Sequence, residues 1–129
     1  MTQRLNISSG SYLEPIMGFS RAVRVGRQIS VAGTAPIAAG GGNACVGDVA
    51  GQTRRCIDII AAALTEAGAG LEHVVRSRIM LTDINRWREA GQVHGEVFAA
   101  IRPVITVVQV SAFVDPEWLV ELEVDAVLP

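Results

Sequence analysis

The sequence predicts an α+β fold in which two helices pack on one face of a mixed β-sheet. Several short segments alternate apolar and polar residues with a period of two, which is typical of strands with one buried face. Two longer segments, 49–67 and 85–101, repeat their apolar residues with helical spacing. The predicted order is strand, strand, helix, strand, helix, strand, strand, and each helix is long enough to connect two parallel neighbouring strands.

Length and charge limit the class of protein. The chain has 129 residues, which predicts one domain, 1–129. A net charge of −2 provides no basic surface for a phosphate backbone, so nucleic acid is not an expected partner. No segment approaches the roughly 18 apolar residues of a membrane span, and Met1–Arg4 leads into no apolar signal segment. We therefore expect a cytoplasmic protein with no membrane partner.

Metal and phosphate sites are not predicted. Cys45 and Cys56 have no further cysteine or histidine at ligand spacing, which indicates reduced thiols and neither a disulfide nor a zinc site. The Gly-rich segment 38–43 lacks the helix spacing and the lysine of a phosphate-binding loop, so a plain connector is favoured. No cofactor is expected.

The first part of the predicted sheet is a hairpin. Segments 19–25 and 28–37 have strand patterns on either side of Gly26–Arg27, and 4–8 is a candidate short strand before them. Three arginines cluster in this hairpin, and such a charged rim is usually solvated: Arg21, Arg24 and Arg27.

The first helix is predicted to begin after Asp48 and to end at Gly68 and Gly70. The strand that follows, 73–83, has two distinct faces. One face should carry Val75, Ser77, Ile79 and Leu81. The other should carry Val74, Arg76, Arg78 and Met80. Asn85 is the predicted cap of the second helix, whose buried stripe should consist of Trp87, Ala90, His94, Val97, Phe98 and Ile101.

The last two predicted strands lie in 101–111 and 118–126, joined through a turn at 115–117. In the final strand one face is apolar: Val120, Leu122, Val124 and Ala126. The other carries Leu119 with three carboxylates, Glu121, Glu123 and Asp125. Arg76 and Arg78 are candidate partners for these carboxylates. The mixed face that they share is too apolar to remain bare, so we expect other copies of the chain to cover it.

Several motifs together resemble the RidA (YjgF) family of reactive-intermediate deaminases, often labelled endoribonuclease L-PSP. They are Val25–Gly26, Ile29–Pro36, the helix 48–67 ending in Glu66–Gly68, Leu81–Ile84, Arg102–Pro103 and Leu119–Glu123. The resemblance covers most of the chain. It implies a chorismate-mutase-like fold and a homotrimer with three clefts between subunits that bind small carboxylate-bearing ligands. Active members hydrolyse enamine and imine intermediates to a keto acid and ammonia.

The resemblance implies an altered site. The family's substrate-carboxylate arginine matches Ile105, which cannot form a bidentate pair with a carboxylate. Three further polar positions of the family match Phe19, Ala32 and Gly91. Glu121 matches the glutamate that positions the hydrolytic water, and the Gly33 turn and the main chain around Val107 are retained. The resemblance therefore predicts feeble activity on 2-aminoacrylate.

Three residues of the expected cleft have alternative interpretations. Glu121 is either the catalytic carboxylate or a structural partner of Arg76 or Arg78. Arg102 is more simply a solvated charge at a helix C-terminus than a replacement anion clamp. His94 is more simply a core or interface histidine than a ligand or proton carrier.

Two functional hypotheses follow. In the first, a water held by Glu121 attacks an imine-like carbon, and Arg102 or main-chain amides hold the substrate. In the second, the protein is a non-catalytic binding module with an apolar cleft lined by Phe19, Ala32 and Ile105. A ribonuclease fits poorly, because the chain is acidic and lacks a constellation of serine, histidine and lysine.

Overall fold

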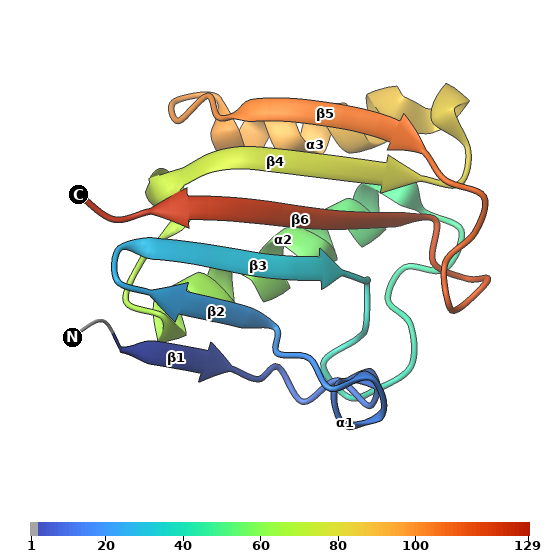
Figure 1. Ribbon diagram of the computed structural model, residues 1–129. Helices are drawn as coiled ribbons and strands as arrows, with labels where there is room; N and C mark the ends of the chain where they lie inside the picture. The colour runs from blue at the N-terminus through green and yellow to red at the C-terminus, as the bar shows by residue number, and fades with distance from the viewer. Residues whose placement is uncertain (1–2) are drawn as a thin grey trace.

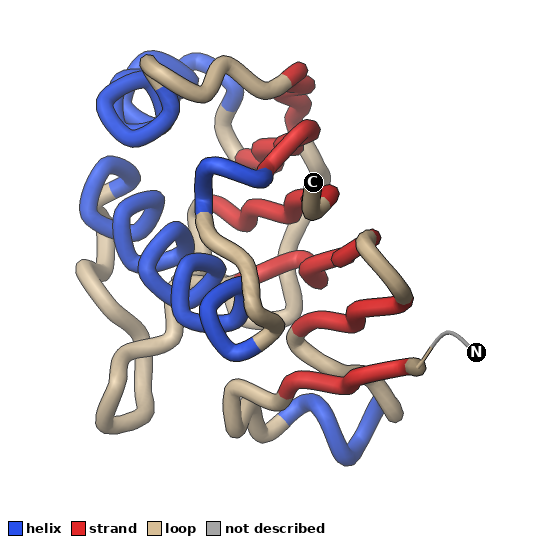
Figure 2. The backbone as a smooth tube through the Cα atoms, turned by 90° about the vertical axis from the view of Figure 1, so that its left-hand side faces the viewer, coloured by secondary structure: helices blue, strands red, loops and turns tan. Residues whose placement is uncertain are grey.

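A six-stranded mixed sheet is the frame of the molecule, with strand order β1-β2-β3-β6-β4-β5 (Figure 1). The computed structural model describes residues 3–129. Met1 and Thr2, which belong to the predicted domain 1–129 and to the segment Met1–Arg4, lie outside the described residues. Both long helices cover the same face of the sheet (Figure 2). The predicted α+β layer is therefore confirmed.

The strands are β1 (Arg4–Ile7), β2 (Ala22–Val25), β3 (Gln28–Thr34), β4 (Val74–Leu81), β5 (Val104–Gln109) and β6 (Val120–Val127). The helices are α1 (Leu13–Met17), α2 (Val49–Glu66) and α3 (Trp87–Phe98), with short 3-10 turns η1 (Leu71–His73) and η2 (Ile84–Arg86).

The final strand, β6, lies at the centre of the sheet and is antiparallel to both of its neighbours, β3 and β4. As predicted, α3 connects two parallel neighbours, β4 and β5. The same expectation is wrong for α2, because β6 separates the two strands that α2 connects. The late insertion of β6 between them places the last strand of the chain against the helices, where its apolar face is buried: Val120, Leu122, Val124 and Ala126.

One predicted strand face is wrong at the start of β4. Val74 is 3% exposed, whereas Val75 is 47% exposed, the reverse of the expected alternation. The pairing of β4 with β6 shifts register between Val74 and Arg76. Such an extra residue in one strand reverses the side on which the residues before it point. From Ser77 onward the predicted faces are correct.

The ends of α2 follow from its sequence. The Asp48 carboxylate accepts a hydrogen bond from the Gly51 amide at 3.0 Å, as predicted for an N-cap. After the helix, Gly68 has a φ of 86°, a conformation that favours glycine. Arg24 donates from Nη1 to the Ala67 carbonyl at 2.7 Å, and a Cβ on residue 68 would lie 2.8 Å from that nitrogen. Gly68 therefore permits both the turn and the arginine contact.

The second long helix is shorter than predicted. The turn η2 precedes it, and Asp83 caps this turn by accepting a hydrogen bond from the Asn85 amide at 3.0 Å. The prediction that Asn85 caps the second helix is wrong, because Asn85 lies inside η2 and α3 begins after Arg86, which makes no side-chain capping bond. Trp87 lies in the first turn, where it is 48% exposed and not buried against the sheet. Ile101 follows the helix and is partly buried. The residues of α3 that are buried are Ala90, Val93, His94 and Phe98.

Smaller differences concern the first forty residues and the membrane. The strand β3 ends at Thr34 and not at Ile37, and the short helix α1 was not predicted. Pro15 lies inside α1, which is only five residues long and has no repeating apolar pattern. Within residues 3–129, no helix combines the length and the apolar character that crossing a bilayer requires.

Candidate functional site

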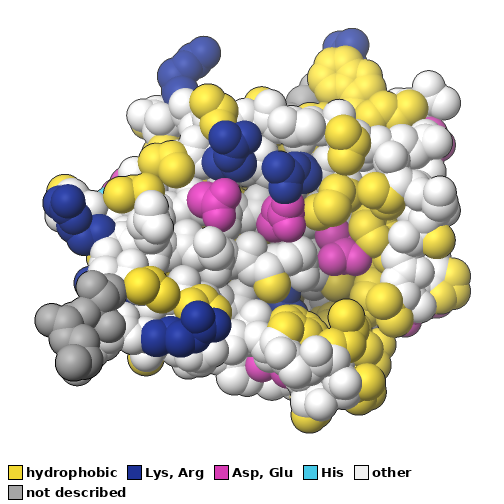
Figure 3. Space-filling model, in the orientation of Figure 1, with side chains coloured by type: hydrophobic (Ala, Val, Ile, Leu, Met, Phe, Trp, Pro, Cys, Tyr) yellow, Lys and Arg dark blue, Asp and Glu magenta, His cyan; other side chains and the backbone are white. Residues whose placement is uncertain are grey.

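The sheet face opposite the helices carries a central group of charged side chains from β4 and β6 (Figure 3). Arg76 Nε lies 4.0 Å from an Asp125 carboxylate oxygen, and Arg78 forms an ion pair with Glu123. The expected match between arginines and carboxylates is therefore correct for two of the three carboxylates on β6.

Glu121, the third carboxylate, has a different environment. Its neighbour on β4 is Met80, which carries no charge. On the other side lies Gly33, and a Cβ at that residue would be 3.2 Å from Glu121 Oε1. No residue within 3–129 donates a hydrogen bond to this carboxylate. The structural alternative that paired Glu121 with Arg76 or Arg78 is therefore wrong.

Burial raises the pKa of the Glu121 carboxyl, because removal from water disfavours the charged form. Arg21 opposes this effect, and the negative charge of Glu123 adds to it. The cation that acts on Glu121 is thus Arg21, which immediately precedes β2, and neither of the arginines on β4. A half-buried carboxyl that makes no hydrogen bond to the protein remains able to bind water.

Arg21 is 4% exposed, so the prediction of a solvated arginine rim is wrong at this position. Its Nε donates to Ser9 Oγ at 3.1 Å, and its Nη1 donates to the Gly33 carbonyl at 2.8 Å and to Thr34 Oγ1 at 3.2 Å. The guanidinium lies 5.4 Å from the centre of the Phe19 ring, within the range of a cation–π contact. Arg21 therefore connects two predicted site residues, Phe19 and Gly33.

Glu14, which the sequence pattern did not single out, fixes the loop beside Arg21. Its Oε2 accepts hydrogen bonds from the Ser9 amide at 3.1 Å, the Ser9 hydroxyl at 3.2 Å and the Ser11 amide at 3.0 Å. Burial alone would raise the pKa of Glu14, but these bonds and one from Ser8 lower it. Glu14 is therefore an ionised acceptor that links α1 to the loop and, through Ser9, to Arg21.

The predicted site residues form two groups within one chain. Phe19, Ala32, Gly33 and Glu121 lie together at one end of β2, β3 and β6, and the Ala32 amide donates to the Arg21 carbonyl at 2.8 Å. Ile105 and Val107 lie on the edge strand β5, where their β4 neighbours are Ser77 and Ile79. Since β4 separates β5 from β6, one chain does not bring Ile105 to Glu121.

Gly91 and His94 lie on α3, behind the sheet. His94 Nε2 is 2.7 Å from Ser77 Oγ, and its ring stacks on Phe98 with a centroid distance of 4.4 Å. Burial lowers the pKa of His94, which favours the neutral ring. This histidine is thus hydrogen-bonded and packed inside the core.

Arg102 lies after the turn that follows α3 and has a left-handed conformation with a φ of 57°. Its amide donates to the Phe98 carbonyl at 2.8 Å, which closes the helix, and its side chain is exposed. This position is normally occupied by glycine. The geometry agrees with the simpler interpretation of Arg102 as a helix C-terminal residue.

The thiols have ordinary structural positions. Cys56 is completely buried, and burial raises its pKa. Cys45 is exposed. Among residues 3–129, no three histidine, cysteine, aspartate or glutamate side chains converge as a metal site would require.

The chain is similar in sequence to proteins of one known family. The sequence profile of the family described as endoribonuclease L-PSP matches residues 9–128. A RutC family protein from Pyrococcus abyssi is 38% identical over 110 residues, which cover 85% of this chain and 86% of that protein. The 3-aminoacrylate deaminase RutC of Acinetobacter baylyi is 32% identical over 108 residues, covering 84% of this chain and 85% of that enzyme.

A solved structure has the same fold. A member of the YjgF/YER057c/UK114 family from Mycobacterium tuberculosis superposes with a TM-score of 0.89 and 47% sequence identity. The match covers 98% of this chain and all of that one.

Proposed function

Because the chain belongs to the endoribonuclease L-PSP family, which includes the RutC and YjgF proteins, we propose that it hydrolyses an imine or enamine metabolite in clefts between subunits of a homotrimer. One observation carries the catalytic part of this proposal. Glu121 is a half-buried carboxyl that is not engaged by any residue within 3–129, whereas Glu123 and Asp125 beside it are ion-paired.

The proposed chemistry is addition of water to a carbon–nitrogen double bond. Glu121 orients the water and accepts a hydrogen bond from it while the oxygen attacks the imine carbon. Proton transfer to nitrogen then allows ammonia to leave, and a carbonyl compound remains. The sequence contains no lysine, so the chain provides no lysine amine for a covalent Schiff base, and water is the nucleophile.

Ile105 limits the substrates of this proposed site. A branched aliphatic side chain cannot hold a carboxylate in the way that an arginine does at the matching family position. The Arg102 side chain is exposed beyond the end of α3, and no contact within residues 3–129 directs it toward Glu121. We therefore expect weak hydrolysis of 2-aminoacrylate and better hydrolysis of an imine that carries no carboxylate.

Assembly is the second part of the proposal. Ile105 and Val107 on β5 cannot meet Glu121 within one chain, but they can meet the Glu121 of a neighbouring subunit. Exposed valines on β5, Val104 at 58% and Val108 at 37%, give this edge the apolar character of an interface. Light scattering at micromolar concentration should give three times the mass of one chain. A monomer mass would refute this part.

The catalytic role is tested by Glu121→Gln, which keeps the size of the side chain and removes the carboxylate. We expect turnover of a substrate established for the wild type to fall about a hundredfold or more, the usual contribution of a positioned acid or base. The matched control is Glu123→Gln, two residues away on the same face, which should keep turnover within about threefold because Glu123 already pairs with Arg78.

A binding module without catalysis is the alternative, and the apolar residues Phe19, Ala32 and Ile105 favour it. If Glu121→Gln leaves turnover unchanged, the catalytic assignment is wrong and the binding function gains support. Cleavage of RNA is less well supported, because both histidines are engaged. His73 Nδ1 accepts from the Gly70 amide at 3.0 Å, and His94 pairs with Ser77.

A further inference from the structure

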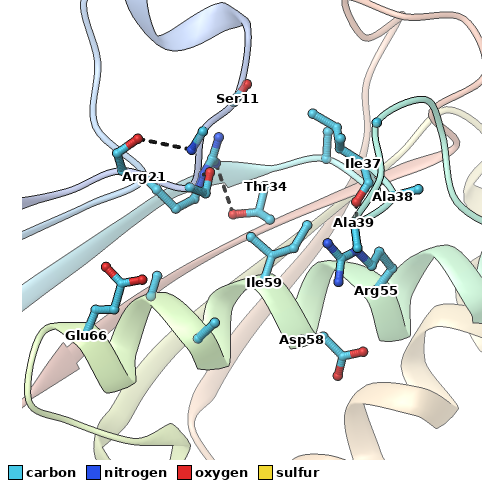
Figure 4. Close-up of a pocket in the computed structure, with 17 residues that line it drawn as sticks. Ser11, Arg21, Thr34, Ile37, Ala38, Ala39, Arg55, Asp58, Ile59 and Glu66 are labelled. Atoms are coloured by element: carbon cyan, nitrogen blue, oxygen red, sulfur yellow. Dashed lines mark hydrogen bonds between the residues drawn. The ribbon is translucent and has the colours of Figure 1, made fainter.

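A second cavity lies on the helix side of the molecule and does not include Glu121. Its volume is about 380 Å³, within the range of small-molecule sites. Three segments enclose it: the loop 8–11, the chain after β3 from Thr34 to Gly41, and the exposed side of α2 (Figure 4).

Arg21 gives this cavity a cationic wall. Its Nε and Nη1 bind Ser9, Gly33 and Thr34, but Nη2 makes no hydrogen bond with any residue within 3–129. Since every fully buried side-chain nitrogen or oxygen among those residues has a partner, Nη2 is not sealed inside the protein. One amino group of Arg21, a residue that is 4% exposed, thus has no hydrogen-bond partner among these residues and can bind a ligand.

The charge of Arg21 is only partly compensated. Glu14 and Glu121 are the carboxylates that act on it, but neither lies within the 4.0 Å of an ion pair. Burial lowers the pKa of Arg21 despite both carboxylates, which means that the cation is poorly solvated where it stands. An anion placed on Nη2 would therefore be stabilised more strongly than at a surface arginine.

The rest of the cavity has both apolar and polar walls. Figure 4 shows Ile59 of α2 facing Thr34 and the Arg21 guanidinium across the space, with Ile37 and Ala39 at one end. Ala62 and Ala63 of α2 also line it. The α2 side carries two exposed carboxylates, Asp58 and Glu66, and one cation, Arg55, whose Nε donates to the Ile37 carbonyl at 2.7 Å. The net charge of these three side chains is negative, so they would disfavour a second negative charge on a ligand.

We propose that this cavity binds a small monocarboxylate with an apolar tail, with the carboxylate on Arg21 and the tail over Ile59 and Ala62. The hydrogen-bond chain from Arg21 through Ser9 to Glu14 holds the loop 8–11 in place, so the wall is formed before the ligand arrives. The cavity lining does not include Glu121, although Arg21 borders both sites, and the proposal stands whether or not Glu121 is catalytic.

The test is isothermal titration of the intact protein with hexanoate and with hexanedioate. Hexanoate should bind, and hexanedioate should bind at least fivefold more weakly because of Asp58 and Glu66. The variant Ala62→Phe fills the cavity from an exposed position of α2 and should abolish hexanoate binding without loss of melting temperature. Ala99→Phe, exposed beyond the end of α3, is the matched control and should bind as the wild type does.

Two further variants identify the anion contact. Arg21→Gln should weaken hexanoate binding at least tenfold, and Arg21→Lys should weaken it less, because lysine keeps the positive charge and loses only the guanidinium geometry. If Arg21→Gln does not fold, hexanoate binding by Ala62→Phe alone tests whether the ligand occupies the cavity. The proposal is overturned if hexanoate does not bind the wild type, or if Ala62→Phe binds it normally. It is also overturned if Glu121→Gln weakens binding as strongly as Ala62→Phe, because the ligand would then occupy the other face.

Discussion

The two ends of the open sheet face carry the same type of side chain in different states. At one end, Asp125 accepts a hydrogen bond from Ser30 on β3 at 3.2 Å and lies beside Arg76 on β4. At the other end, Glu121 has Gly33 on the β3 side and Met80 on the β4 side, and neither side chain offers a proton. Asp125 has partners on both neighbouring strands and is exposed, whereas Glu121 has no such partners and is half-buried.

This contrast shows that a strand pattern does not determine the state of a carboxylate. Glu121, Glu123 and Asp125 share one face of β6 with a period of two. What separates them is the pair of residues opposite, which depends on the pairing of β6 with β3 and β4, two strands that lie far from it in the sequence. A carboxylate left without partners at a partly buried position is typical of a functional site.

The largest of these effects is expected for Gly33→Ala, which should displace the unpaired Glu121 carboxylate. The new Cβ would lie 3.2 Å from Glu121 Oε1, so the carboxylate must move by a few tenths of an ångström. We expect turnover to fall about tenfold, because small displacements of a positioned group reduce rate strongly. The control is Gly95→Ala on exposed α3, where no atom lies within 4 Å of the added Cβ. If both variants turn over normally, the position of Glu121 is not important for the reaction.

The second prediction concerns pH and stability. Because the folded-state pKa of Glu121 is raised, the folded protein holds this proton more tightly than the unfolded chain, whose glutamate pKa is about 4.3. Ionisation of Glu121 therefore reduces stability as the pH rises through the folded-state pKa. Glu121→Gln should melt a few degrees above the wild type at pH 7.

That advantage should disappear below about pH 4, where Glu121 is protonated in both states. Differential scanning calorimetry across this range checks the sign. Glu123→Gln loses an ion pair and should not melt higher than the wild type at pH 7. A lower melting temperature for Glu121→Gln at pH 7 would show that its carboxylate stabilises the fold.

The smallest effect is expected for the ion pair of Arg78 and Glu123. A double-mutant cycle of Arg78→Met and Glu123→Gln should give a coupling free energy below about 1 kcal/mol, because both side chains are partly exposed. Urea denaturation of the four proteins measures it. A coupling of several kcal/mol would mean that this pair, and not only Glu121, is shielded from water.

The sheet was largely predictable from the sequence, because periodicity records burial on one face. The β6 alternation from Val120 to Ala126 is the clearest case. Local irregularities were not predictable. The bulge at Val75 exchanges two chemically similar valines, so no composition signal marks it. Asp83 and Asn85 have similar capping propensity, so the sequence does not show that Asp83 caps the short turn η2 or that α3 begins after Arg86 without a side-chain cap.

The site was less predictable than the fold. Arg21, Arg24 and Arg27 are spaced three residues apart and carry the same local signal, yet Arg21 is buried, Arg24 caps α2 and Arg27 is exposed. What distinguishes Arg21 is its contact with the end of β3 and with the loop that Glu14 fixes. Those contacts arise from tertiary packing, and a single sequence contains no record of them.

The edge strand β5 affects the tendency of the protein to aggregate during storage. Val104–Gln109 contains no charge, proline or glycine, and within residues 3–129 it pairs only with β4. Such a six-residue segment is the kind that stacks into cross-β fibrils when its outer side is uncovered. A single copy of the chain therefore presents a template for adding foreign strands while it is still fully folded. Loss of the protein on storage can begin from the native state, without any unfolding of the core.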